Sequence, residues 1–156
     1  LPRIPVIRVM PNTPALFRQG MIVVCRGRFA RTEDEKKAKH LLEPAGVVIS
    51  ETEDRFNAVT AVSGSGPAYI FYVAEAMIKT ALKFGFGRVT ARLLVAQTIF
   101  GAASMLKNSG DAPDILRKKV TSPGGTTERA LCYFEKNKFG EIISGAIKRQ
   151  DGDFQY

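Results

Sequence analysis

The sequence predicts a mostly α-helical protein in which a short α/β segment precedes an all-helical region. Two observations lead to this fold class. The first third of the chain contains short runs of β-branched apolar residues, typical of buried strands, at 6–10, 21–25 and 47–50. The remaining two thirds place apolar residues at three- and four-residue steps, as in helices that pack along one face. Because the composition changes near residues 53–57 without a flexible linker, we expect two domains, 1–55 and 56–156.

The α/β segment should run in the order strand, loop, strand, helix, strand. The loop "PNTPALFRQG" after the first strand has two prolines and a closing glycine, which favour turns. A helix is predicted at 33–43, with Thr32 as its N-cap and Glu35 completing a capping box. Pro44 and Gly46 should end this helix. Three strands are too few for a complete doubly wound domain.

The helical region begins with a helix-compatible stretch at 54–62, which "SGSGP" at 63–67 interrupts. Pro67 suits the first position of the next helix, where its missing N–H costs nothing. Thr90 is the predicted cap of the second long helix. The pattern predicts helices at 67–84, 91–108, 113–120, 126–137 and 141–150.

The two long helices are apolar around much of their circumference. The stretch "AYIFYVAEAMI" carries Glu75 as its only charge. A helix of this kind is normally central in a large bundle, and the rest of the region is too small to bury two of them. We therefore expect a homodimer that interleaves helices, with a compact monomeric bundle as the alternative. Assembly beyond the dimer is left open.

Composition and charge argue against several classes of protein. An apolar content of 45% argues against disorder. No run approaches the length of uncharged apolar residues that spans a bilayer, so no membrane segment is expected. The net charge of +8 is spread along the chain, at +3 over 1–56 and +5 over 57–156. Without clustered bases and stacking aromatic residues, we expect a solvated basic surface and no nucleic-acid partner.

Cysteine usage indicates a reduced, cytoplasmic protein. Cys25 and Cys132 lie far apart and lack metal-ligand spacing, so we expect two free thiols that act as small buried apolar groups. No other residues have a recognisable metal-ligand spacing, and no metal is expected. The chain opens on Leu1 with no initiating Met and no secretory signal, so we expect a fragment or a processed product.

Three motifs together resemble pyrroline-5-carboxylate reductases. They are "MPNTP" at 10–14, "AVSGSGPAY" at 61–69 and "VTSPGGTTERAL" at 120–131. The third places four hydroxyl residues around a Pro-Gly-Gly turn between two predicted helices, more than a simple cap requires. The resemblance extends to about residue 150. It implies the end of a Rossmann-type domain followed by a helical dimerisation domain, and an enzyme that reduces the ring C=N of pyrroline-5-carboxylate with NADPH or NADH to give L-proline.

The resemblance implies that the third motif binds this small anionic substrate. The first N–H groups of a helix are unpaired and lie at the positive end of its dipole. We expect the N–H groups of Gly125, Thr126 and Thr127 to face the substrate carboxylate, with the Ser122 hydroxyl beside it. Thr127 is the predicted catalytic residue, contacting the ring nitrogen and relaying its proton, and water is the alternative proton source. A merely well-capped turn is the alternative for the whole loop.

For the cofactor, the resemblance implies that Met10, Asn12 and Thr13 line the nicotinamide side. The alternative is a proline-bounded turn with an Asx-type hydrogen bond. No G-x-G-x-x-G follows a predicted strand and opens a helix. We therefore expect the segment that binds the cofactor's pyrophosphate to lie upstream of this chain. The sequence does not distinguish NADPH from NADH.

Three functional hypotheses follow. The first is the substrate-binding and dimerisation part of a pyrroline-5-carboxylate reductase. The second is a non-catalytic helical dimerisation module, and the absent glycine-rich loop is what separates the two. The third is a related imine reductase.

Overall fold

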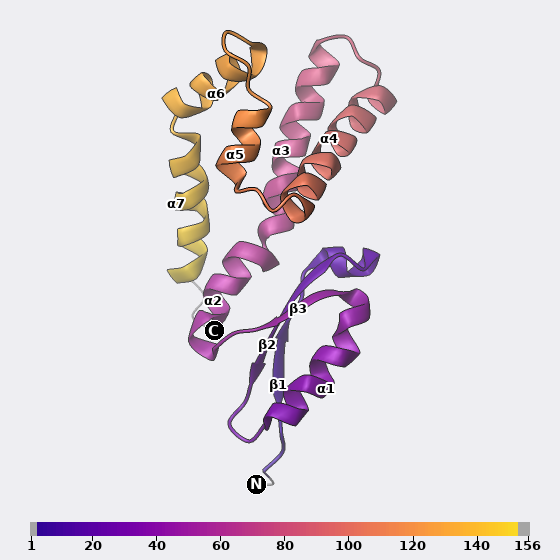
Figure 1. The fold of residues 1–156 in the computed structure, drawn as a ribbon, viewed down its shortest axis with the longest axis vertical. Helices are drawn as coiled ribbons and strands as arrows, with labels where there is room; N and C mark the ends of the chain where they lie inside the picture. Colours follow the sequence, from indigo (N-terminus) through magenta and orange to yellow (C-terminus); the bar gives the residue numbers. More distant parts are fainter. Residues whose placement is uncertain (1–2, 153–156) are drawn as a thin grey trace. The chain divides into compact units, whose positions relative to one another are not determined.

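The computed structural model describes residues 3–152 of the chain (Figure 1). The chain divides into two compact units. One comprises Leu1–Tyr69 and Gly145–Tyr156, and the other comprises Ile70–Ser144. The chain changes from strands to helices near residue 55, where the sequence predicts a domain boundary. That two domains meet at this residue stays a prediction.

The first unit contains a three-stranded sheet in the order β1-β2-β3. Strand β1 (Ile7–Met10) runs antiparallel to the central strand β2 (Gly20–Arg26), and β3 (Gly46–Ser50) runs parallel to β2. The carboxyl end of β1 therefore lies at the amino ends of β2 and β3. The rule that ligands bind at the carboxyl ends of parallel strands does not, by itself, predict a site after β1.

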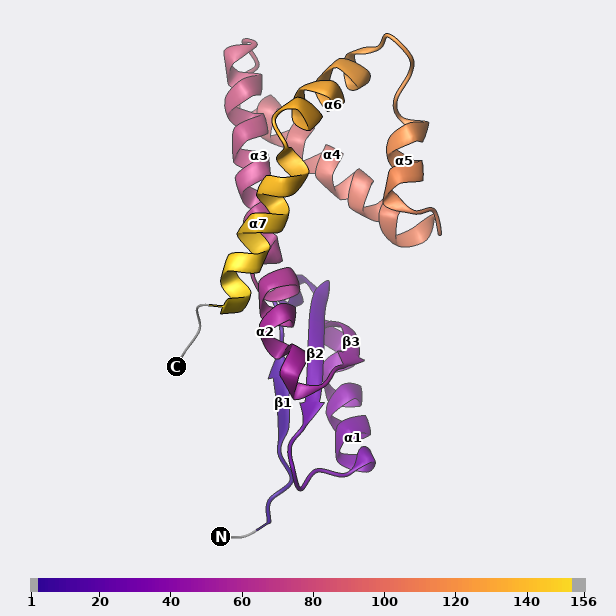
Figure 2. The same cartoon turned by 90° about the vertical axis from the view of Figure 1, so that its left-hand side faces the viewer.

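Helices cover both faces of this sheet, with α1 (Thr32–Leu42) on one side and α2 (Phe56–Val59) on the other (Figures 1 and 2). Side chains alternate between the faces of a strand. Val23 and Cys25 of β2 pack with the fully buried Phe56 of α2. Ile22 and Val24, which are also buried, lie on the opposite face. The centre of β2 is therefore the core of this unit.

The predicted capping box of α1 is wrong by one residue. Arg31 is the N-cap, and its N–H donates to the Asp34 carboxylate at 2.8 Å. The two predicted residues have other partners. Thr32 accepts a hydrogen bond from Arg26 at 3.1 Å, and Glu35 forms an ion pair with Arg26 at 2.9 Å.

The "SGSGP" stretch interrupts the helix, as predicted. Helix α2 continues into a π-helical turn, η4 (Thr60–Gly64), and α3 (Gly66–Lys83) begins after a bend at Ser65. The N–H of Ser65 donates to the carbonyl of Thr60, five residues earlier, at 2.8 Å. Pro67 is consequently the second residue of α3. Such single π turns often occur at functional sites.

The second unit is helical. It contains most of α3 together with α4 (Arg88–Asn108), α5 (Pro113–Lys119) and α6 (Thr126–Lys136), and α7 (Phe139–Gly152) begins in it. These bounds agree with the predicted helices to within three residues. The cap of α4 is Gly87, so the predicted cap, Thr90, lies inside the helix.

Few side chains of the second unit are buried within the chain. Among its described residues, Ala91 and Val95 are the buried hydrophobic ones, while Phe84 and Val89 are 76% and 83% exposed. Judged by length and composition alone, helix α4 is long and apolar enough to cross a membrane. Only 11% of its most apolar stretch is buried in the structure. A core helix of a protein assembly has the same character. The absence of a membrane partner stays a prediction.

Candidate functional site

The loop between α5 and α6 forms a tight turn of four residues, Ser122 to Gly125. The N–H of Gly125 donates to the carbonyl of Ser122 at 3.0 Å, and Gly124 has a φ of 71°. Proline at the second position and a positive φ at the third define a type II turn. Glycine is therefore required at Gly124 for its backbone conformation.

At Gly125 the absence of a side chain matters for a different reason. Its φ of −76° is open to any residue. A Cβ there would lie 3.0 Å from the carbonyl oxygen of Ser122 and well inside contact distance of the Ser122 hydroxyl. The Ser122 side chain thus folds over the α-carbon of Gly125. The expectation that the Gly125 N–H faces a ligand is wrong, because that N–H closes the turn.

Three N–H groups at the start of α6 have no partner among the described residues, those of Thr126, Thr127 and Glu128. Gly125 caps this helix, and Thr126 and Thr127 are its first two residues. N–H groups at these positions have no partner inside the helix. Thr127 is half-buried, whereas Ser122 and Thr126 are exposed. The structure therefore brings together all four residues predicted to bind the substrate.

The hydroxyls of this loop fall into two kinds. Thr121 donates to the carbonyl of Arg117 at 2.6 Å and so closes the last turn of α5. Within residues 3–152, no hydrogen bond engages the hydroxyls of Ser122, Thr126 and Thr127. These three hydroxyls are thus available to a bound molecule, and that of Thr121 is not.

Sequence reasoning missed two residues that hold the turn from α6. The Glu128 carboxylate accepts a hydrogen bond from the Gly124 N–H at 2.7 Å. The Arg129 guanidinium donates to the Gly124 carbonyl at 3.1 Å. The signal was present, because a glutamate at the third position of a helix often reaches back to the preceding loop.

The "MPNTP" loop contacts the π-helical turn of the same unit. The amide nitrogen of Asn12 donates to the Ser63 carbonyl at 3.0 Å, and its amide oxygen accepts from the Met21 N–H at 2.9 Å. The sulfur of Met10 lies 3.8 Å from the position that a Cβ of Gly64 would take. Thr13 is exposed at the start of a short 3₁₀ helix, Thr13–Phe17. The amide of Asn12 is thus largely engaged by the protein itself.

The described residues fit only part of a nicotinamide dinucleotide. Among residues 3–152, the connection from β2 to α1 contains a single glycine, and no helix opens from a glycine-rich loop directly after a strand. A pyrophosphate site requires such a loop, because its backbone N–H groups and the helix N-terminus bind the phosphates. Residues such as Met10 and Thr13 could contact the nicotinamide end alone.

A polar cavity of about 590 Å³ lies at the carboxyl ends of β2 and β3 in the first unit. Its carboxylates already have cationic partners, as Glu53 pairs with Arg8 and Glu51 lies 3.7 Å from Arg55. Burial, followed by the nearby Glu53, raises the pKa of the Cys25 thiol. A thiol held in its neutral form is a poor nucleophile. Within the described part of the chain, no cluster of side chains could hold a metal ion.

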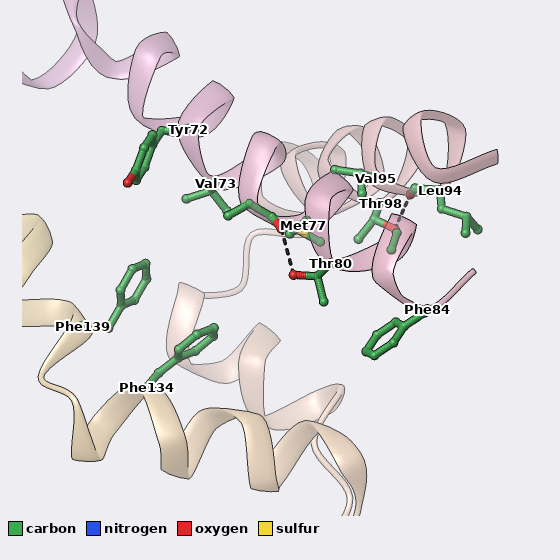
Figure 3. Close-up of a pocket in the computed structure, with 12 residues that line it drawn as sticks. Tyr72, Val73, Met77, Thr80, Phe84, Leu94, Val95, Thr98, Phe134 and Phe139 are labelled. Atoms are coloured by element: carbon green, nitrogen blue, oxygen red, sulfur yellow. Dashed lines mark hydrogen bonds between the residues drawn. The ribbon is translucent and has the colours of Figure 1, made fainter. Parts of the chain in front are cut away.

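An apolar groove of about 530 Å³ lies within the helical unit (Figure 3). Phe84, in the turn after α3, and Leu94 of α4 line it together with Phe134 and Phe139, whose rings stack 5.0 Å apart. The groove lacks the polar groups that bind a charged metabolite. It suits another apolar surface.

Both cysteines are free, and Cys132 of α6 is exposed, contrary to the expectation that both are buried.

The fold and site define a helical association domain that carries a hydroxyl-rich turn and follows part of an α/β domain. Residues 53–151 match the family model described as pyrroline-5-carboxylate reductase dimerisation. The chain belongs to this family. The resemblance found in the three motifs is thereby confirmed, and so is the fold class.

Relatives agree over nearly the whole chain. The chain is 44% identical to a pyrroline-5-carboxylate reductase of Corynebacterium melassecola, over 94% of this chain and 53% of the relative. It is 40% identical to a protein of the same name from Arabidopsis thaliana, over 90% of this chain and 51% of the relative. A solved Plasmodium falciparum pyrroline carboxylate reductase with NADP bound superposes with a TM-score of 0.88 at 32% identity, over 94% of this chain and 56% of that one. The chain spans about half the length of the curated relatives it matches.

Proposed function

We propose that this chain is the substrate-binding and dimerisation part of an NAD(P)H-dependent pyrroline-5-carboxylate reductase, which forms L-proline. The observation that supports this most strongly is the Ser122–Gly125 turn at the start of α6, in a chain that belongs to the reductase family. The turn leaves three helix N–H groups and three hydroxyls for a small anion. Because the chain spans about half of its relatives, the activity belongs to a longer protein that contains it.

In this proposal, the N–H groups of Thr126 and Thr127 bind the substrate carboxylate, and the Ser122 hydroxyl donates to it. Such charge-assisted hydrogen bonds contribute roughly 1.5–3 kcal/mol each. The Thr127 hydroxyl contacts the ring nitrogen. A threonine hydroxyl is a weak acid, so the proton reaches the nitrogen either through Thr127 or directly from water. The protein contributes mainly by positioning.

A nicotinamide cofactor supplies the hydride when it is bound. Met10 and Thr13 contact its nicotinamide end in this proposal. Asn12 contributes chiefly by holding the loop that carries them, since its amide already bonds Ser63 and Met21. The described residues do not bear on the choice between NADPH and NADH.

We further propose that the helical unit forms a homodimer in the cytoplasm. Its apolar groove and the exposed apolar residues of α3 and α4 are left uncovered by the chain itself. A second copy would bury these residues and give α4 the surroundings of a core helix. The match to a dimerisation domain supports this assembly. Assembly of dimers into a larger homo-oligomer is compatible with the same interface.

The test is turnover of pyrroline-5-carboxylate by the full-length protein, with L-proline identified as the product. NADPH and NADH are compared as donors, and other cyclic imines are offered in parallel. Preference for another imine would favour the related-reductase hypothesis. A folded full-length protein that reduces none of these imines would overturn the proposal. The 156-residue chain by itself should dimerise without turnover.

A further inference from the structure

We propose that Glu128 is a positioning residue that sets the shape of the substrate loop by holding the N–H of Gly124. This inference rests on the proposed function of the loop. The contact that carries it is the 2.7 Å hydrogen bond from the Gly124 N–H to the Glu128 carboxylate. Hydrogen bonds to an ionised acceptor are roughly twice as strong as neutral ones.

The peptide that Glu128 holds is the one that distinguishes two kinds of turn. In a type II turn, the peptide between the second and third residues is rotated relative to its orientation in a type I turn. Here that peptide joins Pro123 to Gly124, and its N–H faces α6. In a type I turn, the Pro123 carbonyl would take that place and would face the Glu128 carboxylate. The Glu128 carboxylate therefore favours the type II turn in two ways: it attracts the Gly124 N–H, and it would repel the Pro123 carbonyl of a type I turn.

Arg129 acts on the next peptide of the same turn. Its guanidinium donates to the Gly124 carbonyl at 3.1 Å, and the N–H of that peptide donates to Ser122 at 3.0 Å. Two consecutive peptides are thus held by neighbouring residues of the first turn of α6. The N–H groups of Gly124 and Gly125 are engaged, so those of Thr126, Thr127 and Glu128 remain for the substrate.

The position of the Ser122 hydroxyl depends on this arrangement. The Ser122 side chain lies over the α-carbon of Gly125, as the close approach to a Cβ at that position shows. Rotation of the Pro123–Gly124 peptide would move Ser122 relative to Gly125 and to the start of α6. Glu128 thereby acts on the substrate site through the backbone, without a role in the chemistry.

Charge makes this choice of residue informative. A carboxylate near a helix N-terminus is itself stabilised there and would repel an anionic substrate. The bond to Gly124 and the adjacent Arg129 offset that repulsion. Glu128→Gln keeps an acceptor and removes the charge, whereas Glu128→Ala removes the acceptor. Comparison of the two variants therefore separates the effect of the hydrogen bond that holds the turn from the effect of the negative charge.

The first test measures the turn itself in the 156-residue chain labelled with ¹⁵N-glycine. In Glu128→Ala, the Gly124 amide proton should move upfield more than any other glycine amide, because its charge-assisted bond is lost. In Glu128→Gln the movement should be smaller. Glu135→Ala, an exposed glutamate on the same helix, is the matched control. If the Gly124 resonance stays unmoved in folded Glu128→Ala, the proposal is wrong.

The second test uses the full-length protein. Glu128→Ala should raise KM for pyrroline-5-carboxylate about 3- to 30-fold with little change in kcat, because it weakens binding alike in the ground and transition states. Glu128→Gln should restore KM to within about threefold of the parent, since an amide oxygen still accepts the bond. Equal effects of Ala and Gln would overturn the positioning role. A parent protein without turnover would instead contradict the proposed function, and the glycine resonances would still report on the turn.

Discussion

The side-chain amide of Asn12 donates to the carbonyl of Ser63, 51 residues further along the chain, at an N···O distance of 3.0 Å. The same amide accepts from the Met21 N–H at the start of β2. One half-buried side chain therefore joins the loop after β1, the central strand and the π-helical turn. A residue first assigned to the cofactor thus has a structural role that needs no ligand.

Asn12→Asp should destabilise the protein by about 1–3 kcal/mol, because a carboxylate cannot donate to Ser63 and would face its carbonyl oxygen instead. The Met21 bond would survive, since the carboxylate still accepts it. Urea unfolding followed by circular dichroism measures the change. Asn57→Asp, at an exposed position of α2, is the control. Equal stability of Asn12→Asp and the parent protein would show that the amide does not hold the loop.

The strands and helices could be predicted from periodicity because burial imposes it. Residues 22–25 of the predicted run 21–25 are buried, on both faces of β2, as the uninterrupted apolar character of the run indicated. The start of α1 was misassigned because Thr32 and Glu35 are bound by residues far away in the sequence or on other elements. Local cap patterns carry no information about such competing partners.

The candidate site could be predicted in part. The motifs located the turn, yet the sequence could not show that the Gly125 N–H closes it or that Glu128 holds Gly124. Both facts depend on the φ of Gly124, which glycine leaves open. The antiparallel direction of β1 relative to β2 could not be predicted either, because a run of apolar residues does not indicate whether two strands pair parallel or antiparallel.

Glu35 makes stability depend on pH. The Ser50 hydroxyl first, and then Lys39 and Arg26, hold the pKa of its carboxyl below the usual range. A folded pKa below the unfolded value near 4.5 means that the unfolded state binds the proton more readily. The stabilisation is therefore complete above the unfolded value and is lost as pH falls through the folded one.

Glu35→Gln should accordingly cost about 1 kcal/mol at neutral pH, given a carboxylate that is 17% exposed. The difference from the parent protein should shrink steadily below about pH 4.5. Thermal unfolding across this range measures it. Glu33→Gln, on the exposed face of α1, should show a smaller difference at every pH. A Glu35→Gln deficit that persists unchanged into strong acid would contradict the ion-pair account.

Phe84→Glu should dissociate the proposed homodimer. Phe84 lines the apolar groove and is 76% exposed in the single chain. Burying such a ring contributes about 1.5–3 kcal/mol, so the dimer dissociation constant should rise at least tenfold. Sedimentation velocity at micromolar concentration measures this. Leu41→Glu, at a 78% exposed position on α1 of the first unit, should leave the dimer intact. A parent chain that sediments as a monomer would refute the assembly.

Gly125→Ala should displace the Ser122 hydroxyl while the protein stays folded. The new Cβ would press on that hydroxyl, which can rotate away, and would lie 3.0 Å from the Ser122 carbonyl, which must shift by a few tenths of an ångström. We expect a loss of stability below about 1.5 kcal/mol and a higher KM for pyrroline-5-carboxylate in the full-length protein. Gly140→Ala, with open space around its Cβ, is the control. An unchanged KM would remove Ser122 from the proposed site.

Thr127→Val tests the residue to which the chemistry is assigned. The two side chains are nearly equal in size, and their helix propensities are similar, so the second residue of α6 should remain folded. The change removes a hydroxyl that has no partner within residues 3–152 and leaves the backbone N–H in place. Carboxylate binding should therefore persist, while the contact to the ring nitrogen is lost.

Loss of one hydrogen bond to a charged ligand corresponds to roughly 1.5–3 kcal/mol, so kcat/KM for pyrroline-5-carboxylate should fall about 10- to 200-fold in the full-length protein. NADPH affinity should be unchanged, because the pyrophosphate site lies elsewhere in this proposal. Thr90→Val, an exposed threonine in the first turn of α4, is the matched control and should keep the parent rate. If folded Thr127→Val keeps the parent kcat/KM, its hydroxyl has no part in the reaction, and the proton must reach the ring nitrogen from water.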